Sequence, residues 1–237
     1  MTTDTTATTT PHTSGHAPGQ PGHGRPRWWA VSGLLAGAAG LGSIVASSSI
    51  TAVYEEELMG DAPAIVERLS EQTTQIFALG AFGLLAMALL VPFAAGLRRR
   101  LAEGSPAGGS LLPDVAYAGL LLTCVAGLMG TGLNTEFGFA LATDHTRLVP
   151  EVGVVFGHWT GTIPWLWVGA GLTGVAVALA ALRQGAAPRW LGWASVVLGG
   201  LTLVAGLSPL QYVAGFVGPV YVLVLGMGFA FGDRASR

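Results

Sequence analysis

The chain has 237 residues, 51% of them hydrophobic and only 10% charged, whereas a soluble domain carries charges on about a quarter of its residues. This deficit leaves too few charges to cover a water-facing surface and indicates a membrane protein. The formal net charge of −2, without a continuous basic stretch, excludes a surface built to bind nucleic acid. The single cysteine, Cys124, excludes an intrachain disulfide or a multi-cysteine metal site.

Residues 1–24 form a low-complexity tail of Thr, Pro, Gly and His with almost no large apolar side chains. Such a segment cannot bury enough surface to offset the entropy lost on ordering, so we predict that it is disordered. His12, His16 and His23 are irregularly spaced and have no cysteine beside them, which favours a solvated tail over a metal site. The remaining residues, 25–237, are predicted to form one membrane domain.

Six apolar runs follow the tail, and each is long enough to cross a hydrocarbon core of roughly 30 Å as a helix. The predicted crossings are 28–54, 73–97, 114–133, 163–182, 190–207 and 212–231. A cleaved signal peptide is the alternative for the first run, because Ala46, Ser47 and Ser48 resemble a cleavage site. The long polar tail ahead of that run argues against cleavage, as does the even number of crossings that the charge pattern requires.

The charged residues predict the orientation of these crossings. All eleven basic residues are Arg, and nine lie on one side of the six runs: Arg25, Arg27, Arg98, Arg99, Arg100, Arg183, Arg189, Arg234 and Arg237. Nine of the thirteen acids lie on the other side, together with Arg68 and Arg147. Because short cytoplasmic loops accumulate Lys and Arg, we predict a multi-pass protein of the cytoplasmic (plasma) membrane with both termini, and hence the tail, in the cytoplasm.

Small residues recur at helical spacing within the apolar runs and allow neighbouring backbones to approach closely. Four runs carry such residues: Gly33, Gly37 and Gly40 in the first, Gly80 and Gly83 in the second, Gly127 and Gly130 in the third, and Gly171 and Gly174 in the fourth. We interpret them as packing seams within the chain. A homo-oligomer or a membrane partner held through these Gly-rich faces is the alternative.

No Asp, Glu, Lys, Arg or His lies deep inside a predicted crossing, which argues against a proton-coupled pump. The polar side chains that remain at depth are Ser43, Ser47, Gln75, Thr123, Cys124, Thr173, Ser195 and Thr202. Hydroxyl groups in membrane helices usually donate to backbone carbonyls of their own or a neighbouring helix. We expect the same structural role here.

The first outer segment opens with three adjacent acids, Glu55, Glu56 and Glu57. Three carboxylates could attract calcium, but no ligand loop accompanies them, which favours a solvated charge run. Asp61 ahead of Pro63 is typical of a helix start, and a short amphipathic helix is predicted over Ala64–Leu69.

The second outer segment, from about Asn134 to Thr162, is far longer than the connections usual between bundle helices. Its apolar side chains indicate that it folds back onto the bundle as an interfacial or re-entrant element. Gly161 and Pro164 are expected to break the helix before the fourth crossing.

This segment also carries the candidate catalytic residues Glu136, Asp144, Glu151 and His158. Glu151 and His158 are seven residues apart, so they share one helix face, and a carboxylate beside an imidazole is a plausible acid–base pair. A zinc ion on His145, His158 and one carboxylate is a second interpretation. A lid helix whose polar face meets water is the third, and neither a metal nor a cofactor is assigned.

A ligand pocket, if present, is predicted beneath this outer segment, between helix ends. The candidate ligand-binding residues there are Gln75, Asn134, Trp159, Gln211 and Tyr212.

The turn Pro-Arg-Trp-Leu-Gly-Trp at 188–193, together with the topology of residues 28–232, resembles uncharacterised six-helix integral membrane proteins of actinobacteria. This resemblance implies an all-α membrane bundle and no particular activity. The leading hypothesis is an accessory, small-molecule-binding or permeation unit. The alternatives are a membrane enzyme that acts on a lipid or terpenoid at the outer face, and a sensor or subunit of a membrane complex.

Overall fold

A computed structural model of the chain describes residues 27–106 and 108–232, and all of the regular secondary structure within these ranges is helical. Five described helices are long and apolar enough to cross a membrane: Trp28–Ser48, Thr73–Glu103, Leu112–Arg147, Arg189–Gly206 and Gln211–Phe231. The predicted all-α, multi-pass membrane bundle is therefore confirmed. The tail predicted over residues 1–24 lies outside the described residues.

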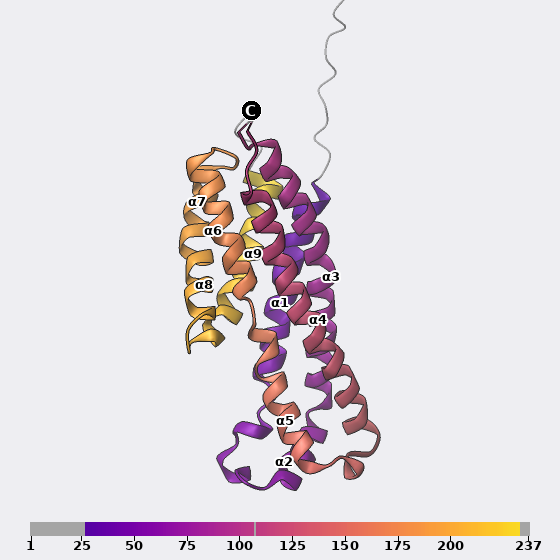
Figure 1. The fold of residues 1–237 in the computed structure, drawn as a ribbon. Helices are drawn as coiled ribbons and strands as arrows, with labels where there is room; N and C mark the ends of the chain where they lie inside the picture. The colour runs from indigo at the N-terminus through magenta and orange to yellow at the C-terminus, as the bar shows by residue number, and fades with distance from the viewer. Residues whose placement is uncertain (1–26, 107, 233–237) are drawn as a thin grey trace, which may run out of the picture.

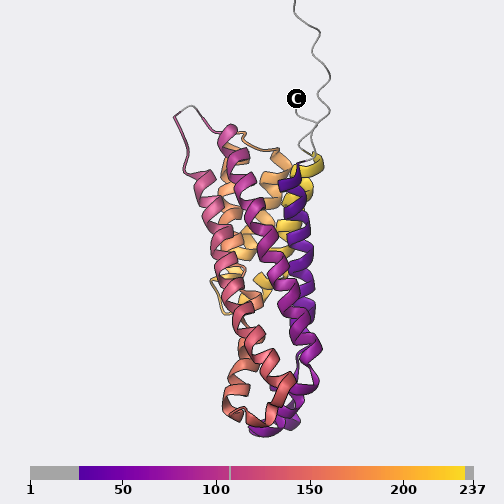
Figure 2. The same ribbon diagram turned by 90° about the vertical axis from the view of Figure 1, so that its right-hand side faces the viewer.

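The long helices stand side by side in an elongated bundle (Figure 1). They are α1 (Trp28–Ser48), α3 (Thr73–Glu103), α4 (Leu112–Asp144), α6 (Val168–Arg183), a rod formed by α7 (Arg189–Ala194), η5 (Ser195–Gly199) and α8 (Gly200–Gly206), and α9 (Gln211–Phe231). α1 packs between α3 and α9, α4 packs between α3 and α6, and the α7–α8 rod packs against α6 and α9. The start of α1 and the end of α9 meet at one end of the bundle (Figure 2).

At the other end, α3 and α4 project beyond their neighbours and carry the short elements between the crossings (Figure 1). These are η1 (Ala52–Tyr54), η2 (Glu56–Leu58), α2 (Ala62–Glu71), η3 (His145–Arg147), α5 (Pro150–Thr160) and η4 (Ile163–Trp165). We call η1, η2, α2, η3, α5 and the projecting ends of α3 and α4 the outer subdomain, after the side of the membrane predicted for them. Within it α5 packs against α2 and α4, and its position outside the membrane stays a prediction.

Several helix ends differ from the bounds of the predicted crossings. α1 stops at Ser48 rather than at 54, whereas α4 continues as one helix to Asp144, eleven residues past the predicted end. α4 can continue because Leu141 is buried in the outer subdomain, so packing stabilises the helix where hydropathy falls. The fourth run is helical only from Val168, since α5 ends at Thr160 and the predicted break at Gly161 and Pro164 intervenes.

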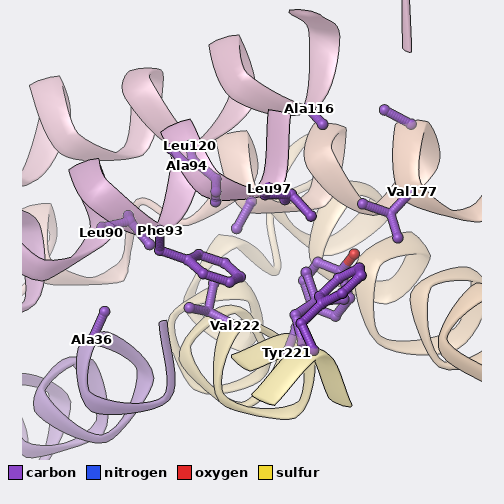
Figure 3. Close-up of a cluster of buried hydrophobic side chains, with 14 of the residues drawn as sticks. Ala36, Leu90, Phe93, Ala94, Leu97, Ala116, Leu120, Val177, Tyr221 and Val222 are labelled. Atoms are coloured by element: carbon purple, nitrogen blue, oxygen red, sulfur yellow. The ribbon is translucent and has the colours of Figure 1, made fainter. Parts of the chain in front are cut away.

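Two hydrophobic cores hold the molecule together. In the bundle core, side chains of α1, α3, α4, α6 and α9 converge, with Phe93, Leu97 and Tyr221 among those that are fully buried (Figure 3). The outer core is smaller and joins Leu69 of α2 and Phe156 of α5 to the projecting end of α3. The rings of Phe137 and Phe156 stack there with centroids 4.5 Å apart.

The start of α2 is set by local chemistry, as predicted. The Asp61 carboxylate accepts a hydrogen bond of 3.1 Å from the Ala64 backbone N–H. Pro63 occupies the first turn, where a backbone N–H would have no partner within the helix, so its absence costs nothing. The buried face of α2 is formed by Ile65, Val66 and Leu69. This face docks the helix onto α5.

Glycines at helix crossings confirm the interpretation of packing seams within the chain. A Cβ added at Gly37 of α1 would lie 2.6 Å from the Pro219 carbonyl oxygen and the Leu223 backbone nitrogen of α9. Gly174 of α6 meets Gly199 of η5 in the same way, backbone against backbone. These glycine faces are therefore occupied by other helices of the same chain.

The crossing of α6 and η5 yields a stability prediction with a matched control. A Cβ added at Gly199 would lie 2.5 Å from the Gly174 Cα, whereas nothing lies within 4 Å of one added at the adjacent Gly200. Because backbone cannot move aside as a side chain can, Gly199→Ala should lower the free energy of unfolding by about 1–3 kcal/mol. Denaturation in detergent micelles measures this, and Gly200→Ala should match the unaltered protein. Equal stabilities of the two variants would contradict the crossing.

Candidate functional site

A cavity lies where the bundle meets the outer subdomain, with a volume of about 30 Å³, enough for one or two water molecules. Its walls come from α1, α3 and α4, and α5 and the α5–α6 connection cover it. The lining residues are Gly40, Ser43, Leu79, Gly83, Ala86, Met87, Thr123, Gly127, Gly130, Thr131, Asn134, Trp159, Thr160, Ile163, Leu166 and Trp167. None of them carries an ionisable side chain, so the cavity suits a neutral group.

Two glycines on α3, Gly80 and Gly83, make room for polar side chains from the facing helices. A Cβ added at Gly83 would lie 2.6 Å from Thr131 Cγ2 and 3.6 Å from Ser43 Oγ. One added at Gly80 would lie 3.1 Å from Asn134 Nδ2. The two glycines, one turn apart, therefore let a polar layer from α1 and α4 pack between the two hydrophobic cores.

Asn134 is the most informative residue of this layer. Its side chain is only 3% exposed, and Nδ2 donates a hydrogen bond of 2.8 Å to the Ile76 carbonyl oxygen. That bond fixes which way the amide points, because only the nitrogen can donate. Oδ1 is then left buried without a partner among the described residues. An unpaired buried acceptor costs about 1–3 kcal/mol, so native structures rarely leave one without a reason.

Ser43 also departs from the expected structural role of hydroxyls at depth. The expectation is confirmed for Thr123, Thr173 and Thr202, which donate to backbone carbonyls at 2.7–3.3 Å. Ser43 is 6% exposed and lines the cavity, yet its hydroxyl makes no hydrogen bond to any described residue. The cavity thus presents a spare acceptor and a spare hydroxyl.

Hydrogen bonds from α1 hold the cover of the cavity in place. The Ser47 hydroxyl donates to the Thr160 carbonyl at the end of α5 at 2.9 Å and accepts from Trp165 Nε1 of η4 at 3.2 Å. Trp159 Nε1 points to the Gly130 carbonyl of α4 at 3.5 Å, which is a long contact. Ser47 therefore fixes α5 and η4 to the bundle, while the Trp159 side of the cover is held more weakly.

Glycines on α5 bring this helix close to the rest of the outer subdomain. An added Cβ at Gly153 would collide with Val66 of α2, and one at Gly157 would collide with Val53 of η1. The sequence contains this signal, since Gly153 and Gly157 are four residues apart, but it was not interpreted as a docking face. α5 thus covers the cavity as a packed helix.

Two of the five predicted ligand-binding residues, Asn134 and Trp159, line the cavity. The other three do not. Gln75 Oε1 is buried without a partner elsewhere on α3, and Gln211 begins α9. The Tyr212 ring packs edge-on against Trp165 with centroids 5.7 Å apart. Ser43 was not predicted as a ligand-binding residue, because hydroxyl groups deep in membrane helices usually donate to backbone carbonyls.

The four candidate catalytic residues lie in the outer subdomain, and no hydrogen bond or ion pair within the described residues joins any two of them. Asp144 pairs with Arg147 at 2.8 Å, and the exposed His158 ring meets Tyr54 edge-on at 5.9 Å. Glu136 and Glu151 are exposed. None of the four lines the cavity.

The metal interpretations find no support in the described part of the chain. No three His, Cys, Asp or Glu side chains there come close enough together to hold a metal ion. His145, proposed as a zinc ligand, instead lies 2.8 Å from a Glu67 carboxylate oxygen of α2. This contact joins the end of α4 to α2 and could not be found from the sequence, because the two residues are 78 positions apart.

Arg68 organises the acidic first outer segment. It contacts Glu55 at 3.1 Å and Glu71 at 2.7 Å. Hydrogen bonds from Thr51 and then Arg68 lower the pKa of the Glu55 carboxyl from its ordinary value. Glu55 therefore stays charged to lower pH than a free glutamate does, which keeps η1 tied to α2.

Comparison with known protein families, with curated proteins and with solved structures finds no match for this chain. The resemblance to the actinobacterial six-helix proteins therefore stays a prediction, and the cavity is the feature that bears on function.

Replacing Ser47 tests how the cover is held. Ser47→Ala removes one bond to Thr160 and one to Trp165 and leaves two buried polar groups unpaired, which costs about 1–3 kcal/mol for each group. Amide hydrogen exchange of α5 should therefore become at least tenfold faster. Ser48→Ala is the control, because the exposed Ser48 hydroxyl donates only to Val45 of its own helix. Unchanged exchange in Ser47→Ala would show that the cover is held by other contacts.

Proposed function

We propose that this chain is a six-crossing protein of the cytoplasmic membrane, with both termini in the cytoplasm, that binds a small neutral molecule beneath the outer subdomain. The observation that carries this proposal is the buried, unpaired Oδ1 of Asn134 at the wall of a cavity that lacks ionisable side chains. A bound molecule would supply the missing partner. The role is therefore that of a binding protein, acting alone or as an accessory unit.

The distribution of charge supports the proposed orientation. At the end of the bundle where α1 begins, Arg98 pairs with Asp114 at 2.6 Å, and Arg100 donates to the Ala186 carbonyl at 2.9 Å. The outer subdomain at the opposite end carries most of the acids. A basic end facing the cytoplasm follows the charge rule for membrane proteins.

The sixth crossing in this proposal is α6, which has 16 residues and spans about 24 Å. That is shorter than the hydrocarbon core, and local thinning of the bilayer accommodates such helices at modest cost. If α6 crosses the membrane, the α7–α8 rod and α9 cross in the directions that their flanking charges predict.

Binding is better supported than permeation or catalysis. A permeation unit needs a continuous polar path, but the bundle core between the cavity and the basic end is filled by fully buried apolar side chains such as Leu90, Leu97 and Leu120. An enzyme of the predicted kind needs acid–base groups at its substrate. Glu136, Asp144, Glu151 and His158 all lie outside the cavity lining.

Cysteine accessibility tests the topology. In a Cys124→Ala background, Glu57→Cys and Pro209→Cys at exposed outer positions should react with a membrane-impermeant maleimide on intact cells. Gly108→Cys and Gln184→Cys, in the connections that precede α4 and α7, should react only after permeabilisation, because both are predicted to face the cytoplasm. Labelling of Gln184→Cys from outside would exclude a crossing by α6. The reverse pattern at all four sites would show that the protein has the opposite orientation in the membrane.

Filling the cavity tests the binding function. Ser43→Leu places a larger apolar side chain in the cavity, so a small molecule that remains with the full-length chain in lipid nanodiscs should be lost, as followed by native mass spectrometry. Ser48→Leu, on the exposed side of α1, should retain it. A molecule retained equally by both variants, or by neither variant nor the unaltered protein, would contradict the proposal.

A further inference from the structure

The depth of the cavity in the bilayer follows from the length of α4. Asp114 lies at the basic end, where it pairs with Arg98. Twenty residues of α-helix separate it from Asn134, a rise of about 30 Å, which equals the thickness of the hydrocarbon core. Gly127, deeper in the cavity, lies about 20 Å from Asp114 by the same measure. In the proposed topology, Asn134 is thus at the outer interface, and the cavity extends from it into the outer leaflet.

The free polar groups of the cavity define the chemistry of the group that fits. The Thr131 hydroxyl is already bonded to the Gly127 and Leu128 carbonyls at 2.9 and 3.1 Å, and the Thr123 hydroxyl to the Gly119 carbonyl. Asn134 Oδ1 is unpaired and can only accept. The Ser43 hydroxyl lines the cavity and can donate. A ligand hydroxyl complements both, because it donates one hydrogen bond and accepts another.

Charged groups fit poorly. A carboxylate or a phosphate would meet the Asn134 oxygen without any lining cation, and an ammonium group would find no lining anion. Burying an unpaired charge in such surroundings is far more costly than burying a hydroxyl that is hydrogen-bonded. The head group is therefore neutral.

The volume of the cavity limits how much of the ligand it encloses. About 30 Å³ holds a hydroxyl and the carbon beside it. Gly127, Ile163 and Leu166 line the cavity and are themselves partly exposed, next to the exposed Leu128 and Met129 of α4. To reach lipid tails, the rest of an apolar ligand would have to pass between α4 and the α5–α6 connection, which pack against each other at Gly130 and Ile163.

We propose that the cavity binds the hydroxyl end of a long-chain apolar alcohol that enters from the outer leaflet, with Asn134 Oδ1 accepting from the hydroxyl and Ser43 Oγ donating to it. This inference rests on the proposed binding function and specifies its ligand class. Asn134 selects a ligand that can donate a hydrogen bond, because its free oxygen can only accept one and its nitrogen is already bonded to Ile76.

Photolabelling with a matched pair of probes tests the ligand class. The probes are a long-chain primary alcohol that carries a diazirine near the hydroxyl, and its O-methyl ether, which lacks only the donor. With the full-length protein in nanodiscs, the alcohol should label α4 around residues 127–134 and the connection around 159–167, saturably. Labelling by the ether should be about five- to tenfold weaker, the ratio expected for one lost hydrogen bond.

Variants locate the interaction. Asn134→Leu should reduce labelling by the alcohol to the level of the ether, and Ser43→Ala should reduce it by a smaller factor. Gln75→Leu is the matched control, because Gln75 Oε1 is also buried and unpaired but lies outside the cavity lining, and it should leave labelling unchanged. If Asn134→Leu fails to fold, Ser43→Ala and the probe pair still decide the question.

The outcomes separate the two proposals. Equal, saturable labelling by the alcohol and the ether that is insensitive to Asn134→Leu would overturn the alcohol as ligand while leaving a binding site. The absence of saturable cavity labelling by both probes would mean that the cavity holds only water and would overturn the binding function as well.

Discussion

Close contact between helix backbones is the constraint on which the rest of this structure depends. Lipid tails are as apolar as leucine side chains, so helices in a bilayer gain little from simply burying apolar surface against each other. They gain instead from tight packing, which glycines permit. Gly37 lets α1 approach the backbone of α9, and Gly174 meets Gly199 across α6 and η5. The π-helical turn η5 forms part of this crossing, where Ser195 also accepts a hydrogen bond from Tyr221.

The cavity arises where this tight packing gives way to a polar layer. Toward the basic end the bundle core is filled, and toward the outer end the outer core is filled, each by buried apolar side chains. Between them lie Ser43, Thr131 and Asn134, opposite the missing side chains of Gly80 and Gly83. In this layer the Asn134 oxygen has no hydrogen-bond partner among the described residues. The resulting space and the unpaired Asn134 oxygen are two consequences of the same local mismatch, and a bound hydroxyl group would resolve both.

The outer subdomain gives the cavity a cover that is more than a surface loop. It has its own hydrophobic core, a cap at Asp61, and polar contacts that link elements distant in sequence, such as the one between His145 and Glu67. Ser47 connects this cover to α1 through Thr160 and Trp165. The hydrogen bond from Trp159 to Gly130 of α4 is long, so it is the weakest of the hydrogen bonds that hold the cover in place.

Features that depend on neighbouring residues alone were predicted well. The cap of α2, the helix break after Thr160 and the glycine seams follow from local geometry that any short segment carries with it. The ends of α1 and α4 were not predicted, because hydropathy marks where a helix leaves lipid and not where tertiary contacts stop supporting it. α4 continues to Asp144 since Phe137 and Leu141 pack in the outer core, which no local pattern reveals.

The candidate site divides along the same line. Asn134 and Trp159 were identified because polar and aromatic residues stand out in an apolar chain, whereas Ser43 was not, because its free hydroxyl differs from a bonded one only in the folded chain. Composition, hydropathy and glycine spacing are properties of single residues and short segments, so the sequence by itself determined the membrane class and the helical architecture. A cavity is the space left by side chains from several distant helices, and an unpaired atom is defined by every neighbour that fails to reach it. Only the tertiary structure could decide either.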